Sequence, residues 1–167
     1  MQLIGILRWM CELGRIDICT EVSMLSLYSV MPHEGHLEAA LQSFSYLKSK
    51  SNSRLIFDLM EPEVEDSNFV ECDWSDFYRG ASEALPPNAP KPLGKGVTLR
   101  MFVDSDHAGD KVSRRSRTGF VIFLNYGMID WLSKKQSTVE TSVFGAEFCA
   151  MKHGIENLCG IRYKLRM

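Results

Sequence analysis

The spacing of apolar residues changes twice along this chain, and these changes limit the folds that it can adopt. In the first fifty residues, apolar side chains recur at helical intervals, beginning with Leu3, Ile6, Leu7, Met10 and Leu13. From about residue 98 they alternate with other side chains, the spacing of a half-buried strand, and from Ser137 the helical spacing returns. The pattern therefore predicts a group of helices, then strands, then a final helix.

The first fifty residues predict three short helices that pack together or onto a partner. The first should end at Gly14, because glycine favours the position after a helix. The second should begin at about Asp17, a good N-cap, and end at Pro32. "HEGH" (33–36) lacks the spacing of H-E-x-x-H, so we interpret it as the start of the third helix. The apolar face of that helix is formed by Leu37, Ala40, Leu41, Phe44 and Leu47.

A linker is predicted in the middle of the chain. Residues 58–83 contain nine acidic side chains and one basic one, and four of the six prolines lie in residues 84–96. Proline fixes φ and removes a backbone donor, so this composition is typical of an extended linker. Trp74, Phe77 and Tyr78 are expected to anchor the linker to a neighbouring part of the protein. The predicted organisation is a helical segment at 1–57, a linker at 58–97 and a mixed domain at 98–167.

Three strands are predicted after the linker, at 98–105, 118–124 and 128–133. "NYG" (125–127) is a tight-turn sequence, so the second and third strands should pair as a hairpin. The final helix begins either at a capping box formed by Ser137 and Glu140 or nearer Ser142. Its apolar stripe is predicted to be the packed face, with Glu147 on the shoulder of that face. The stripe consists of Phe144, Phe148, Met151, Ile155 and Leu158.

Charge and cysteine content limit the compartment and the partners. Residues 1–97 carry a net charge of −6 and residues 98–167 one of +4, so the second half is expected to face a polyanion. The five cysteines are an odd number without a C-x-x-C pair, which favours reduced thiols over a disulfide framework or a zinc ribbon. No apolar run reaches the length of a membrane span, and the N-terminus is a poor signal peptide. We therefore expect an intracellular protein, cytoplasmic or nuclear, without a membrane partner.

"FVDSDHAGD" (102–110) concentrates carboxylates at the end of the first predicted strand. It is not an EF-hand loop, because Ala108 occupies position 5 and Arg115 occupies position 12, where ligands are required. Two interpretations stay open: a polar turn, or a metal site completed by a carboxylate from elsewhere. Glu147 could reach the end of a neighbouring strand, and carboxylate oxygens are ligands that Mg²⁺ prefers. The candidate metal ligands are Asp104 and Glu147, with Asp106 as a further one.

Six basic residues flank the same strands. Such a cluster is either a solvated loop or a set of phosphate contacts, and its place beside the carboxylates favours nucleic-acid binding. His107 directly follows Asp106, and His153 lies on the same predicted helix as Glu147. Neither histidine is assigned a role. The candidate nucleic-acid-binding residues are Lys111, Arg114, Arg115, Arg117, Lys134 and Lys135.

Residues 103–148, "VDSDHAGDKVSRRSRTGFVIFLNYGMIDWLSKKQSTVETSVFGAEF", closely resemble the ribonuclease H (RNase H) domain of copia-type LTR retrotransposon polyproteins. Upstream, "LIGILRWMCELGRIDICTEVSMLS" and "PHEGHLEAAL" are similar to the last helices of the same family's reverse transcriptase. The resemblance covers residues 2–57 and 98–167. The chain departs from the family at His107, where tryptophan is usual, and at Gly145, which replaces the first acid of E-A-E.

The resemblance implies an α/β, RNase H-like fold: three antiparallel strands and then a helix, an incomplete mixed sheet, preceded by a small helical segment. It also implies metal-dependent hydrolysis of RNA in RNA–DNA hybrids, with Asp104 and Glu147 as catalytic ligands of Mg²⁺, which Mn²⁺ can replace. Their carboxylate oxygens are expected to lie about 4–6 Å apart, the span of one bridging ion. The implied partners are an RNA–DNA hybrid, or another nucleic acid, and the rest of the reverse transcriptase polyprotein.

The family's remaining acidic residues lie after the position of Met167, so the resemblance implies a truncated piece that is inactive alone. The alternative is a non-catalytic retroelement remnant that binds nucleic acid weakly. A third hypothesis, a helical interaction module formed by residues 1–57, rests on amphipathic spacing alone. A continuation that carries another strand and a D-N-x-S segment would favour the enzyme.

Overall fold

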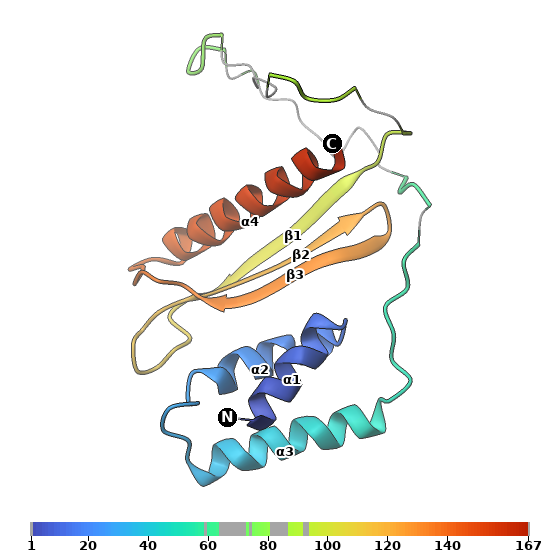
Figure 1. Cartoon of the computed structure of the whole chain (residues 1–167). Helices are drawn as coiled ribbons and strands as arrows, with labels where there is room; N and C mark the ends of the chain where they lie inside the picture. The colour runs from blue at the N-terminus through green and yellow to red at the C-terminus, as the bar shows by residue number, and fades with distance from the viewer. Residues whose placement is uncertain are drawn as a thin grey trace.

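The computed structural model shows a mixed α/β protein in which a three-stranded sheet lies between the N-terminal helices and the single final helix α4 (Figure 1). It describes residues 2–58, 60–63, 73, 75–80, 87–91 and 94–166. Helix α4 packs on strands β1 and β2, and α2 contacts β3 from the other side. The predicted order of helices, strands and helix is confirmed. The elements are α1 (Gln2–Glu12), the 3₁₀ helix η1 (Ile16–Ile18), α2 (Cys19–Ser26), α3 (Glu34–Ser49), β1 (Leu99–Asp106), β2 (Arg117–Leu124), β3 (Gly127–Lys135) and α4 (Val143–Arg166).

Helix α1 ends at a glycine cap, as predicted. Gly14 adopts a φ of 108°, a left-handed conformation that glycine adopts without strain. Its N–H donates to the carbonyl of Cys11 at 3.0 Å, and the N–H of Arg15 donates to the carbonyl of Met10 at 3.0 Å. These two bonds form a Schellman motif, which satisfies the last carbonyls of α1 and turns the chain toward α2.

The predicted limits of the second helix are wrong at both ends. Helix α2 begins at Cys19 and ends at Ser26, so Asp17 lies in η1 and Pro32 lies well beyond the helix. Asp17 does not cap, because its carboxylate accepts two hydrogen bonds from the guanidinium of Arg15, at 3.0 and 2.8 Å. Arg15, and with a smaller effect Tyr46, holds the pKa of Asp17 below its usual value.

Helix α3 begins where the histidine motif predicted, and it ends at Ser49, in the predicted loop sequence. The imidazole Nδ1 of His36 accepts a hydrogen bond from the N–H of His33 at 3.0 Å, which caps the helix start. The predicted packed face is only partly right, because Leu37 and Leu41 are about half exposed (49% and 51%). The first three helices share one core, formed by Leu7, Cys11, Ile18, Val22, Leu25, Ala40 and Leu47.

The three predicted strands are confirmed, and they form an antiparallel sheet in the order β1–β2–β3. The register pairs Asp104 with Gly119, and Gly119 with Ser133. Asn125 forms the predicted turn between β2 and β3 with a φ of 54°, and its N–H donates to the carbonyl of Thr98 at 2.8 Å. A register shift between Ile122 and Phe123 interrupts the pairing of β2 with β3.

Helix α4 begins at the later of the two predicted positions. The hydroxyl of Ser142 accepts a hydrogen bond from the N–H of Gly145 at 3.0 Å, so Ser142 is the N-cap. The capping box of Ser137 and Glu140 is wrong. Glu140 instead accepts a hydrogen bond from the hydroxyl of Thr138 at 2.9 Å, and both residues precede the helix.

The apolar stripe of α4 does not face the sheet, which corrects the prediction. Phe144 is 78% exposed and Phe148 53% exposed, whereas Ala146, Ala150 and Gly154 are buried against the strands. Small residues allow the helix to lie close to the sheet. A Cβ placed on Gly154 would lie 2.6 Å from the sulfur of Met101 on β1.

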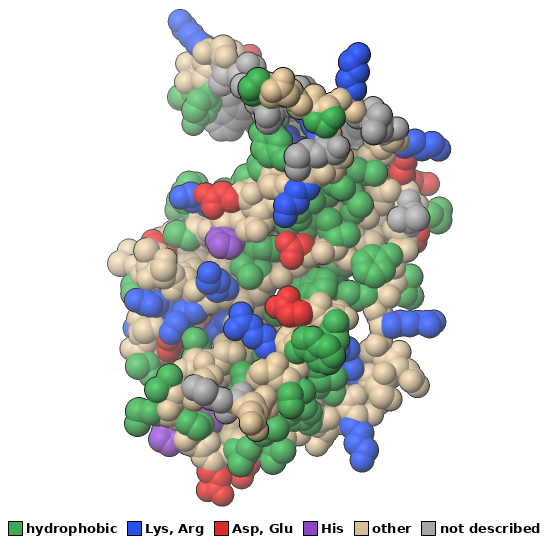
Figure 2. Space-filling model, viewed as in Figure 1, with side chains coloured by type: hydrophobic (Ala, Val, Ile, Leu, Met, Phe, Trp, Pro, Cys, Tyr) green, Lys and Arg blue, Asp and Glu red, His purple; other side chains and the backbone are tan. Residues whose placement is uncertain are grey.

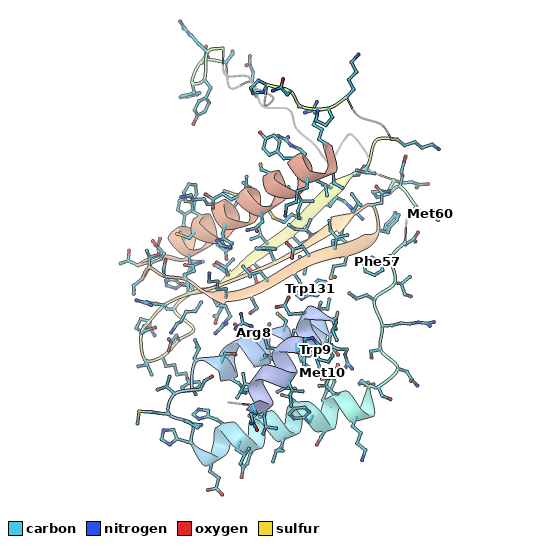
Figure 3. The ribbon with its side chains drawn as sticks, in the orientation of Figure 1. Arg8, Trp9, Met10, Phe57, Met60 and Trp131 are labelled. Atoms are coloured by element: carbon cyan, nitrogen blue, oxygen red, sulfur yellow. The ribbon has the colours of Figure 1, made fainter. Side chains whose placement is uncertain are left out.

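The described linker residues contain neither helix nor strand. Phe77 and Tyr78 are 78% and 65% exposed, so burial does not support their predicted role as anchors, and Trp74 lies outside the described residues. The start of the linker, with Phe57 and Met60, runs upward past the end of the sheet in Figure 3. In the described part of the chain, no helix combines the length and apolarity that a membrane crossing requires.

Candidate functional site

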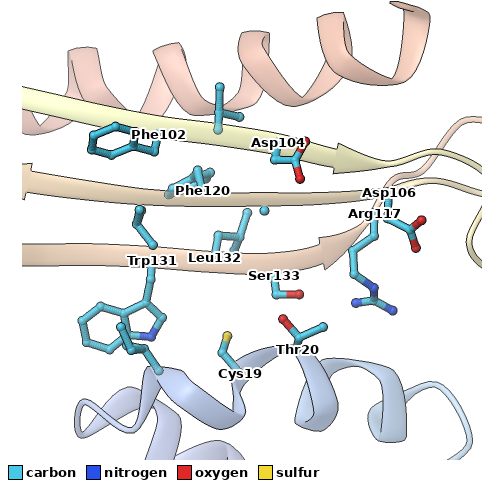
Figure 4. A pocket seen from close by; sticks show the side chains of 14 residues that line it. Cys19, Thr20, Phe102, Asp104, Asp106, Arg117, Phe120, Trp131, Leu132 and Ser133 are labelled. Carbon is cyan, nitrogen blue, oxygen red and sulfur yellow. The ribbon is translucent and has the colours of Figure 1, made fainter. Parts of the chain in front are cut away.

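The carboxylate of Asp104 lies on the face of the sheet that is turned toward the N-terminal helices. Successive side chains of a strand point to opposite faces. Met101 and Val103 approach Gly154 of α4, so Asp104 and Asp106 point the other way. There they line a cavity of about 460 Å³ between the sheet and the region of η1 and α2. Figure 4 shows both carboxylates near the end of β1, at one side of this cavity.

The cavity is lined by apolar residues at one end and by polar residues at the other. Phe102 and Trp131 stand at the apolar end, and Trp131 points from β3 toward α1, on the side where Trp9 and Met10 lie (Figure 3). Asp104, Asp106 and Arg117 stand at the polar end (Figure 4). The wall opposite the sheet is formed by Ile16, Cys19 and Thr20.

Arg117 connects the sheet to α2 at the polar end of the cavity. Its guanidinium donates a hydrogen bond to the hydroxyl of Ser23, which donates in turn to the backbone carbonyl of Ser133 at 2.7 Å. One of the predicted phosphate contacts is therefore held by a structural hydrogen bond. No sequence pattern identified Ser23, because its partners are 94 and 110 positions away.

Glu147 stands on α4, near the same end of β1 as Asp104. It lies two helical turns before Gly154 and on the same helix face, and Gly154 packs against Met101 and Val103. The start of α4 and the end of β1 lie at the same end of the sheet (Figure 1). Glu147 therefore extends from the α4 side of β1, whereas Asp104 extends from the other side. The predicted separation of their carboxylates stays a prediction.

Asp106 has a different local environment from Asp104. A Cβ placed on Gly109 would lie 1.7 Å from Oδ2 of Asp106, so the carboxylate occupies the space beside that glycine. Among the residues that the structure describes, no three side chains of His, Cys, Asp or Glu form a group that could hold a metal ion. Asp104, Asp106 and Glu147 therefore do not form a three-residue metal site in this conformation.

Asp110 organises the loop that carries the basic residues. Its carboxylate accepts hydrogen bonds from the hydroxyl of Ser113 at 2.5 Å, from Nζ of Lys135 at 2.9 Å and from the N–H of Val112 at 3.1 Å. The bond from Ser113, followed by those from Lys135 and Val112, lowers the pKa of Asp110 far below its usual value. Lys135, a second predicted phosphate contact, is thus paired with a carboxylate.

The remaining predicted contacts are more available to a ligand. Lys111, Arg114 and Lys134 are exposed, and Arg115 is half-buried. All four belong to the loop between β1 and β2 or to the end of β3. Figure 2 shows blue side chains gathered on the left of the molecule, at the end of the sheet where this loop leaves.

Both histidines near the site make structural contacts. Nε2 of His107 lies 3.2 Å from the carbonyl of Glu140, so it joins the loop after β1 to the segment before α4. The ring of His153 lies 6.1 Å from that of Phe120, between α4 and β2. These contacts explain why neither histidine could be assigned a chemical role from sequence.

Several known proteins are similar to this chain. The Pol polyprotein from transposon RE1 of Arabidopsis thaliana is 27% identical over 80% of this chain, and that from transposon TNT 1-94 of Nicotiana tabacum is 28% identical over 88%. The chain spans only 7% and 8% of these two polyproteins. The secreted RxLR effector protein 161 of Plasmopara viticola is 25% identical over 99% of this chain and 93% of its own length.

An uncharacterized mitochondrial protein of Arabidopsis thaliana is 42% identical over 33% of the chain and 23% of its own length. No protein-family model matches the chain, and no solved structure matches it either. The similarity to Pol polyproteins agrees with the resemblance of residues 103–148, which include the three strands and the start of α4. These similarities support the interpretation of the chain as part of a copia-type retrotransposon polyprotein.

Proposed function

We propose that this chain joins the end of a reverse transcriptase, at residues 1–57, to an RNase H-like unit at 98–167, with residues 58–97 as the linker. The observation that supports the proposal is the packing of α4, which carries Glu147, on β1, which carries Asp104, in a chain similar to Pol polyproteins. Three antiparallel strands followed by a helix agree with this fold. The parent activity is metal-dependent hydrolysis of RNA in an RNA–DNA hybrid.

Asp104 and Glu147 are the residues that would hold Mg²⁺ or Mn²⁺. Asp104 is exposed on the cavity side of β1 and Glu147 is half-buried on the α4 side, so the proposal requires the two carboxylates to meet around the end of the strand to share a divalent cation. When bound, two such ions stabilise the charge on the attacking and leaving oxygens of a phosphodiester. Two carboxylates offset only half of the charge of two divalent ions, and the described residues hold no larger group. We therefore expect weak metal binding and no detectable cleavage by this chain alone.

The basic loop would position the hybrid beside these carboxylates. Lys111, Arg114 and Lys134 are exposed at this end of the sheet and can contact backbone phosphates. Arg117 and Lys135 are partly engaged by Ser23 and Asp110, so they should contribute less. The hybrid and the rest of the polyprotein are thus the proposed partners.

Metal binding by the whole chain tests the assignment of the carboxylates. Mn²⁺ is titrated into the protein and its binding is followed by electron paramagnetic resonance. Asp104→Asn and Glu147→Gln should each weaken Mn²⁺ binding at least several-fold, whereas Glu38→Gln on α3 should leave it unchanged. Equal binding by all three variants would remove Asp104 and Glu147 from the proposed site.

Cleavage of a labelled RNA–DNA hybrid in Mg²⁺ and in Mn²⁺ tests the activity. We expect no detectable cleavage by this chain, and cleavage when a segment that supplies further carboxylates, taken from a similar Pol polyprotein, is added. Each 1.36 kcal/mol of barrier corresponds to about tenfold in rate, so a missing ion that contributes several kcal/mol lowers the rate at least thousandfold. Cleavage by the chain alone that disappears in Asp104→Asn would show that two carboxylates suffice.

The second candidate function is non-catalytic nucleic-acid binding by a retroelement-derived protein. The absence of a three-residue metal group among the described residues favours it. A secreted effector protein is similar to this chain over nearly the full length of both, so the chain has a relative that is not named as a Pol polyprotein. Hybrid binding that no added segment converts into cleavage would favour this candidate.

A further inference from the structure

The register of the sheet arranges the floor of the 460 Å³ cavity in three rows of side chains. Residues two positions apart on a strand point to the same face of a sheet, and each row crosses β1, β2 and β3 in turn. The rows are Phe102, Val121 and Trp131; Asp104, Gly119 and Ser133; and Asp106, Arg117 and Lys135. All of these residues except Lys135 line the cavity, so its floor changes from apolar to charged along the strands.

The first row provides a surface for an aromatic ring. Trp131 is half-buried, and Figure 4 shows its indole ring turned from β3 toward the helices. Phe102 is 60% exposed at the other edge of the row, and the half-buried Val121 lies between the two rings. Aromatic side chains bind a further ring by offset stacking and by edge contacts. This end of the cavity therefore favours a flat apolar group.

The second row contains a hollow. A Cβ placed on Gly119 would find one neighbouring atom within 4 Å, the carbonyl oxygen of Leu132 at 3.9 Å. The missing side chain thus leaves space that the surrounding residues do not fill. Asp104 stands on one side of this hollow and Ser133 on the other. A ligand that lies on the first row can extend through the hollow to the carboxylate of Asp104.

The polar end of the cavity carries more negative than positive charge. Asp104 and Asp106 are exposed carboxylates, whereas Arg117 is the one cation among the lining residues, and its guanidinium donates to the hydroxyl of Ser23. The carboxylate of Asp106 lies beside Gly109, so Asp104 is the acid that faces the hollow. A cleft with this balance of charge attracts cations.

We propose that this cavity binds a small aromatic cation, with its ring against Trp131 and Phe102 and its ammonium group on Asp104. Neighbouring rows lie about 6.6 Å apart, which suits a ring and an ammonium group joined by about two carbons. The volume of 460 Å³ is in the usual range for small-molecule sites. The site does not depend on hybrid cleavage or on Glu147, and a divalent cation would compete with the ammonium group for Asp104.

Isothermal titration calorimetry of the whole chain with 2-phenylethylamine tests the proposal. We expect a dissociation constant of about 0.1–1 mM, typical of a ligand of this size. Three analogues remove one feature each: 2-phenylethanol the positive charge, 3-phenylpropanoate its sign, and ethylamine the ring. Each analogue should bind at least about threefold more weakly. A dissociation constant above about 10 mM for 2-phenylethylamine, or equal binding of any analogue, would overturn the proposal.

Variants of the floor locate the site. Asp104→Asn and Trp131→Leu should each weaken the binding of 2-phenylethylamine about three- to tenfold. Gly119→Val, with its fold checked by circular dichroism, should fill the hollow and abolish binding. Asp104→Asn changes an exposed group, so it keeps the test decisive if Gly119→Val does not fold. Unchanged binding in Asp104→Asn, or in a folded Gly119→Val, would show that the amine binds elsewhere.

Two controls separate this site from the proposed metal site. Phe148→Ser, on the outward stripe of α4, should leave the binding of 2-phenylethylamine unchanged. Glu147→Gln should also leave it unchanged while it weakens Mn²⁺ binding, because Glu147 lies on the other face of the sheet. Trp131→Leu should have the opposite pattern. Loss of amine binding in Phe148→Ser or Glu147→Gln would place the ligand on the α4 side and overturn the proposal.

Discussion

The N-terminal helices and the final helix bury opposite kinds of side chain. In α1 to α3 the core contains large residues such as Leu7, Val22 and Leu47. In α4 the buried residues are Ala146, Ala150 and Gly154, and the aromatic stripe faces outward. In this chain the short helices interdigitate large side chains with each other, whereas α4 approaches the sheet closely through small ones. Apolar spacing thus identifies a helix and its faces, but residue size decides which face packs.

Truncating the largest fully buried apolar side chains, one in the N-terminal helices and one in the sheet on which α4 packs, is expected to have the largest effect. Leu7 in α1 and Ile122 in β2 are both 0% exposed. Leu7→Ala and Ile122→Ala should each lower the free energy of unfolding by about 2–5 kcal/mol, because each leaves a cavity. Urea unfolding followed by circular dichroism measures this loss. A loss below about 1 kcal/mol for either variant would contradict the burial described here.

Changing the size of side chains on α4 tests directly whether its small residues form the packed face. Ala150→Leu should lower the free energy of unfolding by about 1–3 kcal/mol, because the helix lies too close to the sheet for a larger residue. Phe148→Ser, on the exposed stripe, should change it by no more than about 0.5 kcal/mol. The two variants are compared by thermal unfolding. A larger loss for Phe148→Ser would mean that the stripe is the packed face after all.

The hydrogen bond that connects the sheet to α2 is expected to contribute less to the free energy of unfolding than the buried apolar side chains do. Arg117→Met removes the charged hydrogen bond to Ser23 and should lower the free energy of unfolding by about 1–2 kcal/mol. The signals of Trp9 in α1 and Trp131 in β3 should then separate into two unfolding transitions; tryptophan-to-phenylalanine variants distinguish these signals. Ser29→Ala, which removes a hydroxyl that donates to the carbonyl of Ser26 at the end of α2, is the control. Unchanged coincident transitions in Arg117→Met would show that other contacts couple the regions.

The smallest expected effect is a change in how protein stability depends on pH, and it comes from Asp110 in the loop after β1. The pKa of Asp110 is lowered in the folded state, so its contribution to stability is fully present above its unfolded pKa of about 3.9 and is lost as the pH falls below that value. The melting temperatures of the wild type and Asp110→Asn should differ at pH 7 and converge progressively below pH 4. A constant difference from pH 7 to pH 2 would exclude this linkage.

The elements that local pattern determines were predictable. The alternation in β1, the turn at Asn125 and the glycine cap at Gly14 depend on residues within a few positions of each other. The start of α4 stayed open between two serines because both have the capping chemistry, and the hydrogen bond to Gly145 selects Ser142. The packed face of α4 was predicted wrongly because large apolar residues were given more weight than alanine and glycine.

The candidate site was only partly predictable, because some of its contacts join residues that are far apart in the sequence. Asp104 and the basic loop are contiguous in sequence, so a motif reveals them. The contact of Arg117 with Ser23 and the cavity wall formed by η1 and α2 depend on how the helices meet the sheet. No local spacing encodes these long-range contacts.

The close fit of Gly109 against Asp106 has a consequence for how this loop can vary. A side chain at position 109 would enter the space of the Asp106 carboxylate, whereas Gly5, Gly35 and Gly160 have open space around them. Replacement of these three glycines meets no steric barrier, but replacement of Gly109 requires Asp106 to move at the same time. A library of random variants should therefore recover glycine at 109 more often than at 5, 35 or 160, and the other residues recovered at 109 should be those that the exposed Asp106 carboxylate accommodates by rotating away.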